Sequence, residues 1–241
     1  MINGKEQQME MKKGKLWGVG VGPGDSELMT LKSVRLIKEC DLIVLPDSKK
    51  RNVAFEIAEK AVPEIKEKKI LKVHMPMIRD KEQLFQAHRQ AAEEISAKLS
   101  EGKNLVFLTL GDPTVYSTYC YVHKNVEKLG YECEMVPGVT SFCAAAATLG
   151  VSLSEGGEGL YIIPGSYENA EKGLDVPGNK VIMKSGKSIG DVKKILKKRE
   201  NTIECSMVEN CGMDDEKIYK NIDEIDENAG YFSLLIVKEK K

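Results

Sequence analysis

Short apolar runs and amphipathic stretches alternate along the first half of the chain. The apolar runs predict strands at 15–21, 40–46, 69–77 and 104–110. Helical periods predict helices at about 26–39 and 51–62, and Asp80 is placed to cap a third helix that runs to about Leu99. The apolar stripe of the first helix consists of Leu28, Leu31, Val34 and Ile37. Because strands and helices alternate, we predict a parallel sheet with helices on both faces.

The pattern changes after Gly111. A further helix precedes a strand at 131–136, and an alanine-rich helix at 143–150 follows. Later apolar runs predict strands at 160–164, 179–184, 202–208 and 231–237. Several of these are followed by polar or turn residues, which predicts a mixed sheet, and the last runs into lysines, which is typical of an edge strand. We therefore predict an α/β protein with a flexible tail (1–13) and two α/β domains (14–113 and 114–241).

Composition and charge restrict the classes of partner. The 241 residues contain 36 Lys and Arg against 37 Asp and Glu, a formal net charge of -1. Such a balance does not favour nucleic acid or anionic lipid as partners. No apolar run approaches the roughly 18–20 residues needed to cross a bilayer, and the polar N-terminus lacks a signal peptide. We expect a cytoplasmic protein.

The six cysteines form no C-x-x-C pair, and no cluster of Cys and His has the spacing of a zinc site. The three histidines are scattered and match no catalytic or metal-binding motif. We expect no bound metal and interpret most of the cysteines as small buried apolar residues.

A glycine-rich turn, GVGVGPGD, follows the first predicted strand and resembles the phosphate-binding turns of nucleotide-binding proteins. A dinucleotide fingerprint needs G-x-G-x-x-G, but from Gly18 the last position is Pro23, and from Gly20 it is Asp25. Pro23 removes an amide donor, and Asp25 places a carboxylate where an anion would bind. Asp25 instead suits the cap of the helix that follows. What remains is an open turn at the carboxyl end of a strand, where α/β sheets bind ligands.

Two more stretches have the same character. LTLGDPTVYSTY follows the fourth predicted strand, and there Gly111 exposes backbone while Asp112 offers a carboxylate. EMVPGVTSF places the hydroxyls of Thr140 and Ser141 at the start of the alanine-rich helix. Each of the two is also compatible with a purely structural role.

In this order, GVGVGPGD, LTLGDPTVYST and VPGVTSF resemble the tetrapyrrole methylases, and the resemblance extends over about 15–237. The blocks DSKKRNVAFEIA, SFCAAAATLGVSLSEG, VIMKSGK and VENCGMDDEKIY are similar to the branch that methylates carbon 20 of precorrin-2 or cobalt-factor II. That branch commonly has an Arg-Ala-Ser-like stretch where this chain has Glu209-Asn210-Cys211. The resemblance implies a class III methyltransferase fold with an active cleft between two domains, S-adenosylmethionine as cofactor, S-adenosylhomocysteine as product and a homodimer.

A cofactor with a cationic sulfonium and no phosphate agrees with a turn that has Pro23 and Asp25. The resemblance implies contacts made largely by backbone groups. The implied contact residues are Pro23, Leu110, Gly111, Asp112, Val115, Tyr116, Ser117, Thr140, Ser141, Met183 and Cys211. For Asp112, two roles stay open: acceptance of a hydrogen bond from the methionine amino group, or a place beside the transferring methyl.

The implied reaction is in-line methyl transfer to a carbon of an electron-rich macrocycle, for which the protein must align the reactants and exclude water. A base would assist loss of the ring proton, and the candidates are Tyr116, Lys184 and Asp47. The eight carboxylates of the macrocycle need cations. The candidates are Lys49, Lys50 and Arg51, which follow the second predicted strand.

Other functions stay open. Another tetrapyrrole methylase, or a diphthine synthase, would share the three turns. A nicotinamide-dependent oxidoreductase would use the glycine turn, with Asp47 at the ribose. A non-catalytic scaffold would bind no small molecule.

Overall fold

The computed structural model describes residues 12–47, 51–78, 80–165 and 170–240. Contacts divide the chain into two units, the first comprising residues 1–21 and 26–138 and the second 22–25 and 139–241. The predicted α/β class with two sheets is confirmed. The contact boundary after Gly138 lies beyond the sequence-based boundary at Pro113, because the next strand along the chain pairs with the first strand of unit one.

The first unit contains a five-stranded parallel sheet. Its strands are β1 (Lys15–Gly20), β2 (Leu42–Pro46), β3 (Lys69–Val73), β4 (Leu105–Thr109) and β5 (Glu132–Val136). They lie in the order β3-β2-β4-β1-β5, and every pairing is parallel. The central strand β4 is buried along its whole length, as its apolar sequence requires for a strand covered on both faces.

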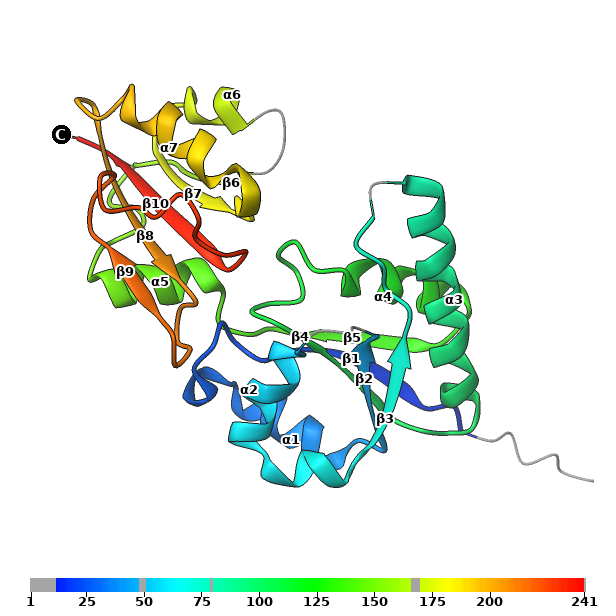
Figure 1. The fold of residues 1–241 in the computed structure, drawn as a ribbon. Coiled ribbons are helices and arrows are strands. Elements are labelled where there is room, and N and C mark those ends of the chain that lie inside the picture. The colour runs from blue at the N-terminus through cyan, green and yellow to red at the C-terminus, as the bar shows by residue number, and fades with distance from the viewer. Residues whose placement is uncertain (1–11, 48–50, 79, 166–169, 241) are drawn as a thin grey trace, which may run out of the picture. The chain divides into compact units, whose positions relative to one another are not determined.

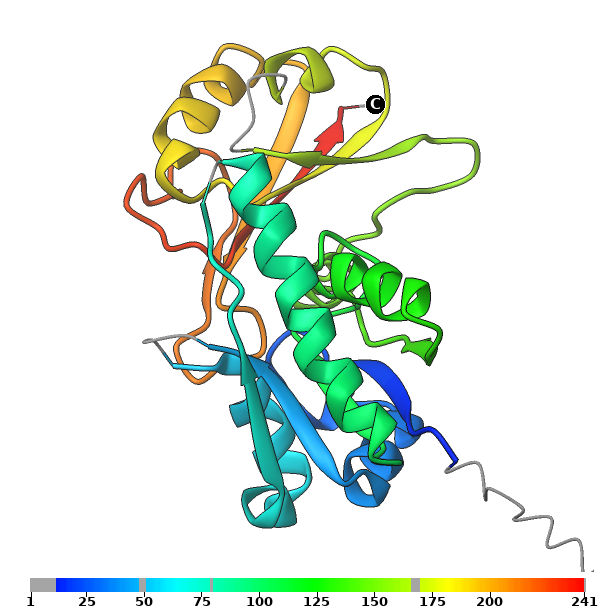
Figure 2. The same cartoon turned by 90° about the vertical axis from the view of Figure 1, so that its right-hand side faces the viewer.

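Helices cover both faces of this sheet (Figures 1 and 2). On one face lie α1 (Leu31–Glu39) and α2 (Val53–Ala61) with the short 3₁₀ helices η1 (Ser26–Leu28) and η2 (Pro63–Glu67). On the other, α3 (Lys81–Ser100) packs beside α4 (Tyr119–Lys128). Asp80 caps α3 by accepting hydrogen bonds from the backbone N–H groups of Glu82 and Gln83, as predicted.

The start of the first helix differs from the prediction. The α-helix begins at Leu31 with Thr30 as its N-cap, so Asp25 is not the cap. The side chain of Leu31 is 89% exposed, and the buried positions of α1 are Ser33, Leu36 and Ile37. The predicted stripe was wrong at its first turn because a 3₁₀ helix and a break precede the α-helix, which shifts the helical phase.

The second unit contains a mixed sheet, as predicted. Its strands are β6 (Leu160–Pro164), β7 (Asn179–Met183), β8 (Ile203–Glu209), β9 (Lys217–Tyr219) and β10 (Ser233–Glu239). Their order is β6-β7-β10-β8-β9, with only the β6–β7 pair parallel. The prediction that the last strand lies at an edge was wrong. β10 is the central strand, and Ser233–Val237 are buried between β7 and β8, while the lysines begin only at Lys238, near the end of the strand.

Helix α5 (Ser141–Leu149) packs on one face of the second sheet, against β8 and β10. The other face is covered by α6 (Ala170–Leu174), η3 (Gly186–Ser188) and α7 (Ile189–Lys197) (Figure 1). Helix α7 was not among the predicted helices. Within the described ranges, no helix has the length and apolar character that a membrane span requires.

Candidate functional site

Three strand ends of the first sheet meet in direct backbone contact. A Cβ atom on Gly20 would lie 2.6 Å from the carbonyl oxygen of Gly111 and 2.6 Å from the nitrogen of Gly138. A Cβ atom on Gly138 would lie 2.2 Å from the Gly111 oxygen. These separations exclude any side chain, so glycine is required at positions 20 and 138 for the loops after β1, β4 and β5 to touch.

The same place is the switch point of the sheet. Strands β1 and β4 are neighbours, but the connections that follow them run in opposite directions along the sheet, from β1 to β2 and from β4 to β5. Helix α1 of the first connection lies on one face of the sheet, and α4 of the second lies on the other. Loops that diverge in this way leave a crevice at the carboxyl ends of the strands, the usual ligand site of open α/β sheets. Gly111 sits there with a φ of 69°, and no described atom lies within 4 Å of the place a Cβ would take.

The Asp112 carboxylate connects two of these loops. Its side chain is buried, and Oδ2 accepts a hydrogen bond of 3.0 Å from the Gly138 N–H. Its other oxygen, Oδ1, accepts hydrogen bonds from the backbone N–H and the hydroxyl of Thr114. Within the described part of the chain, no lysine, arginine or histidine forms an ion pair with Asp112. The strand-end crevice therefore contains a buried negative charge held only by neutral donors.

The rest of this loop is shaped by its backbone. Leu110 is half-buried and packs against the core of the first unit. Tyr116 has a φ of 48°, a left-handed conformation that is unusual for a bulky residue. Ser117 accepts a hydrogen bond of 3.1 Å from the Tyr119 N–H at the start of α4. The structure thus brings Leu110, Gly111 and Asp112 to the crevice and uses Ser117 to begin a helix.

In the second unit, the glycine turn packs on the turn after β8. A Cβ atom on Gly24 would lie 2.2 Å from the carbonyl oxygen of Cys211, and one on Gly212 would lie 2.6 Å from the Asp25 nitrogen. Pro23 is buried in this contact. The structure therefore brings together Pro23 and Cys211, two residues predicted as cofactor contacts and distant in the sequence.

Helix α5 packs beside Cys211, which follows β8. Met183, Val208 and Cys211 pack with α5 in one apolar cluster, and the neighbouring strands place Met183 and Val208 on either side of Leu234. Thr140 is the N-cap of α5, yet its hydroxyl is buried without a hydrogen-bond partner among the described residues. A buried hydroxyl of this kind is normally satisfied by a ligand or water.

The backbone is strained at the ends of β7 and β8. Lys184 directly follows β7 with a φ of 58°, and Asn210 directly follows β8 with a φ of 54°. Together with Tyr116, these are the non-glycine residues with positive φ in the described ranges, and all three adjoin predicted cofactor contacts. Such strain concentrates at functional sites. Burial lowers the pKa of the Lys184 ammonium below its ordinary value.

Sequence reasoning missed a polar network at the end of β8. The buried Glu209 carboxylate accepts hydrogen bonds from the Gly230 N–H (2.6 Å) and the Tyr219 hydroxyl (3.1 Å), and Lys217 lies 3.8 Å away. Burial and the hydrogen bond to Glu209 raise the pKa of Tyr219 to about 12. The network fixes the residue immediately before Asn210. Nothing in the spacing of these residues indicates it, since the partners of Glu209 come from strand β9 and from the loop before β10.

The remaining predicted residues lie in the first unit. Asp47 follows β2, and its exposed side chain lies outside the strand-end contact described above. Arg51 forms an ion pair with Glu56, so its charge is partly neutralised. Lys49 and Lys50 lie outside the described residues. No group of three His, Cys, Asp or Glu residues within the described ranges is arranged to hold a metal ion.

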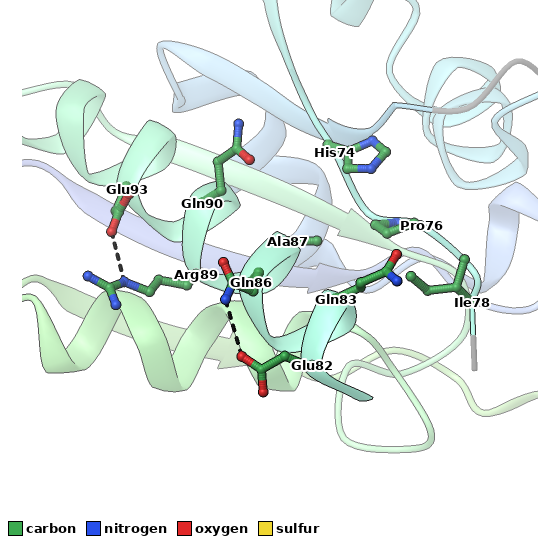
Figure 3. A pocket seen from close by; sticks show the side chains of 10 residues that line it. All are labelled: His74, Pro76, Ile78, Glu82, Gln83, Gln86, Ala87, Arg89, Gln90 and Glu93. Atoms are coloured by element: carbon green, nitrogen blue, oxygen red, sulfur yellow. Dashed lines mark hydrogen bonds and ion pairs between the residues drawn. The ribbon is translucent and has the colours of Figure 1, made fainter. Parts of the chain in front are cut away.

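A cavity of about 860 Å³ lies elsewhere in the first unit, between the segment after β3 and helix α3 (Figure 3). In Figure 3, His74, Pro76 and Ile78 line one side and the residues of α3 line the other. None of the predicted cofactor contacts lines it. Glu93 in its lining is paired with Arg89 at 3.0 Å, so charge does not decide the matter, and we do not place the active site there because those contacts are missing.

The fold occurs among known methyltransferases. A solved structure of uroporphyrin-III C-methyltransferase from Thermus thermophilus, complexed with S-adenosylhomocysteine, superposes with a TM-score of 0.67 over 93% of this chain and 97% of that one. The two sequences are 22% identical, so the likeness concerns the fold.

Comparison of the sequence with known families identifies the family of the chain. The family model "Tetrapyrrole (Corrin/Porphyrin) Methylases" matches residues 15–226, and the chain belongs to this family. It is 38% identical, over 94% of its length and 97% of the relative's, to a probable cobalt-precorrin-2 C(20)-methyltransferase of Methanocaldococcus jannaschii. It is 27% identical, over 93% of its length and 95% of the relative's, to a precorrin-2 C(20)-methyltransferase of Sinorhizobium.

Proposed function

We propose that the protein is an S-adenosylmethionine-dependent methyltransferase that adds a methyl group to carbon 20 of precorrin-2 or cobalt-factor II in cobalamin biosynthesis. The observation that carries this proposal is the 38% identity to a relative named for this reaction, over nearly the full length of both chains. A second relative is named for the same position on the metal-free ring. We propose no resident metal, and any cobalt belongs to the substrate.

The strand-end crevice suits the cofactor by charge. Asp112 is a buried anion without a described cationic partner, which favours a ligand that carries positive charge. Pro23, which has no N–H, lies in the glycine turn where a pyrophosphate would need amide donors. Both features support a sulfonium cofactor and oppose a dinucleotide.

The groups available to hold the cofactor are mostly backbone. In the first unit they are the backbone of Gly111, where a Cβ would meet no described atom within 4 Å, and the loop up to Tyr116. In the second unit they are the turn at Pro23, the Thr140 hydroxyl, which has no hydrogen-bond partner among the described residues, and the backbone at Met183 and Cys211. We propose that these groups bind the cofactor, which supplies an electrophilic methyl group on a positively charged sulfur.

The chain's own task is then alignment and proton removal. The ring carbon forms the new bond to the methyl group, the carbon–sulfur bond breaks, and the sulfur keeps the electron pair. A proton leaves the ring carbon. Lys184 is our preferred acceptor over Tyr116 and Asp47, because burial lowers the pKa of its ammonium and so increases the fraction of neutral amine at a given pH.

Incubating the purified protein with ¹³C-methyl cofactor and each macrocycle, followed by NMR of the product, tests the proposal. We expect the label on carbon 20. A label on another ring carbon would identify a different tetrapyrrole methylase, and no transfer to either ring would contradict the proposal. The competing rates of precorrin-2 and cobalt-factor II would establish which form is the substrate. The homodimer, the cytoplasmic location and the cationic role of Lys49 and Lys50 stay predictions.

A further inference from the structure

The Asp112 side chain has little capacity left for a ligand. A carboxylate offers about four acceptor positions on two oxygens. Two on Oδ1 are taken by the backbone N–H and hydroxyl of Thr114, and one on Oδ2 is taken by the Gly138 N–H. An acceptor dedicated to a ligand's ammonium group would leave more of its positions open in the free protein.

The hydrogen bond to Gly138 has a clear structural consequence. Gly138 is the last residue of the first unit, and its backbone touches both Gly20 and Gly111. Asp112 therefore fixes the distance between the loop after β4 and the loop after β5 at the crevice. The loop after β1 is tied to the end of β4 by a separate hydrogen bond, from the Val21 N–H to the Thr109 carbonyl (2.9 Å), so the bond to Asp112 matters chiefly for the loops after β4 and β5.

We propose that Asp112 is a positioning residue, which holds Gly138 and the Gly111–Thr114 loop in the geometry that binds the adenosine part of the cofactor, and that it is not the acceptor for the cofactor's ammonium group. This inference rests on the proposed function. It excludes one of the two roles that the sequence left open for Asp112, the acceptance of a hydrogen bond from the methionine amino group, and gives the residue a structural task that neither role contained.

Two ligands distinguish these roles. S-adenosylhomocysteine and 5′-methylthioadenosine share the adenosine and the thioether, but only the former carries the amino-acid tail with its ammonium group. The variant Asp112→Asn keeps one oxygen for Thr114 and lacks the anionic acceptor for Gly138. We expect it to weaken both ligands by the same factor, about 10- to 100-fold, as loss of a hydrogen bond to a charged group predicts.

Asp80→Asn is the matched control. Asp80 also accepts hydrogen bonds from two backbone N–H groups, but it is exposed at the start of α3 and lies outside the crevice. We expect this variant to bind both ligands as the wild type does. Both variants should be titrated well below their melting temperatures, so that a change in stability alone does not alter the measured affinity.

The kinetic constants provide a second readout. At saturating cofactor, we expect Asp112→Asn to lower kcat as well, because the displaced loops misalign the methyl group. If the role were only to stabilise the fold, the melting temperature would fall while KM and kcat of the folded enzyme stayed unchanged, and the inference would be wrong.

The other outcomes are also decisive. Weaker binding of S-adenosylhomocysteine with unchanged binding of 5′-methylthioadenosine would make Asp112 the ligand of the ammonium group and overturn the inference. If Asp112→Asn does not fold, Thr114→Val removes one of the three hydrogen bonds to Asp112, the hydroxyl bond to Oδ1, at an exposed position, and we expect smaller but equal losses for both ligands. Unequal losses there would overturn it too. If the wild type binds neither ligand, the proposed function itself fails.

Discussion

The glycine at position 138 provides the sharpest test of how the crevice is built. In Gly138→Ala, the new Cβ would lie 2.2 Å from the Gly111 carbonyl oxygen, whereas ordinary contacts begin near 3.4 Å. The two loops must therefore separate by about 1 Å, since both atoms near the clash belong to packed backbone. Overpacking of this size lowers the free energy of unfolding by about 1–3 kcal/mol. A displacement of about 1 Å at a reacting site lowers kcat/KM by about 10²-fold.

The assay compares steady-state methyl transfer and urea unfolding of Gly138→Ala with those of Gly157→Ala. No described atom lies within 4 Å of the position that a Cβ on Gly157 would take, so the same substitution there meets open space. We expect wild-type kinetics and stability for the control. Wild-type kcat/KM in Gly138→Ala would refute the reasoning that these loops must touch for the enzyme to work.

Three further predictions concern other parts of the chain. Leu235→Ala removes a fully buried side chain from central strand β10 and should lower the free energy of unfolding by about 2–5 kcal/mol. Leu31→Ala, at an 89% exposed position, should change it by less than about 0.5 kcal/mol. Equal values for the two variants in denaturant titrations would contradict the burial pattern. Hydrogen bonds from two lysines lower the pKa of Glu134 to about 2, so its stabilisation is complete above its unfolded value of 4.5 and is lost as the pH falls through about 2. The difference in melting temperature between the wild type and Glu134→Gln should therefore shrink from pH 5 to pH 2, and a constant difference would contradict this. Lys184→Met should lower kcat by about 10²-fold or more. It should also abolish the rise of kcat with pH that a half-buried lysine base produces below its ordinary pKa, and an unchanged pH profile would exclude Lys184 as the base.

Much of the first unit can be predicted from the sequence because its signals are local. Alternating apolar runs and helical periods indicate the parallel sheet, and the Asp80 cap is set by residues two and three positions away. The glycine turn after the first strand and the loop at Gly111 could also be placed at one sheet edge, since parallel strands end on the same side.

The predictions from sequence were wrong where contacts between distant parts of the chain determine the local structure. Asp25 is the preferred type of cap, yet the turn that contains it packs on Cys211 and Gly212 and the helix begins later, at Thr30. The terminal lysines suggested an edge strand, but the pairing of β10 with both β7 and β8 depends on partners elsewhere in the chain.

The candidate site also has features that the sequence predicts and features that it does not. The types of residue at the crevice follow from the motifs, but the hydrogen bond from Gly138 to Asp112 spans 26 positions and has no local signal. The left-handed backbone of Lys184 and Asn210 could not be predicted from the sequence either, because neither position holds the glycine that usually adopts this conformation.

The central claim is that the crevice binds a cationic alkyl donor and not an anionic dinucleotide. Calorimetric titration of the wild-type protein with S-adenosylhomocysteine and, separately, with NADH measures this directly. We predict saturable binding of S-adenosylhomocysteine and no heat from NADH. Tight binding of NADH with no heat from S-adenosylhomocysteine would contradict it.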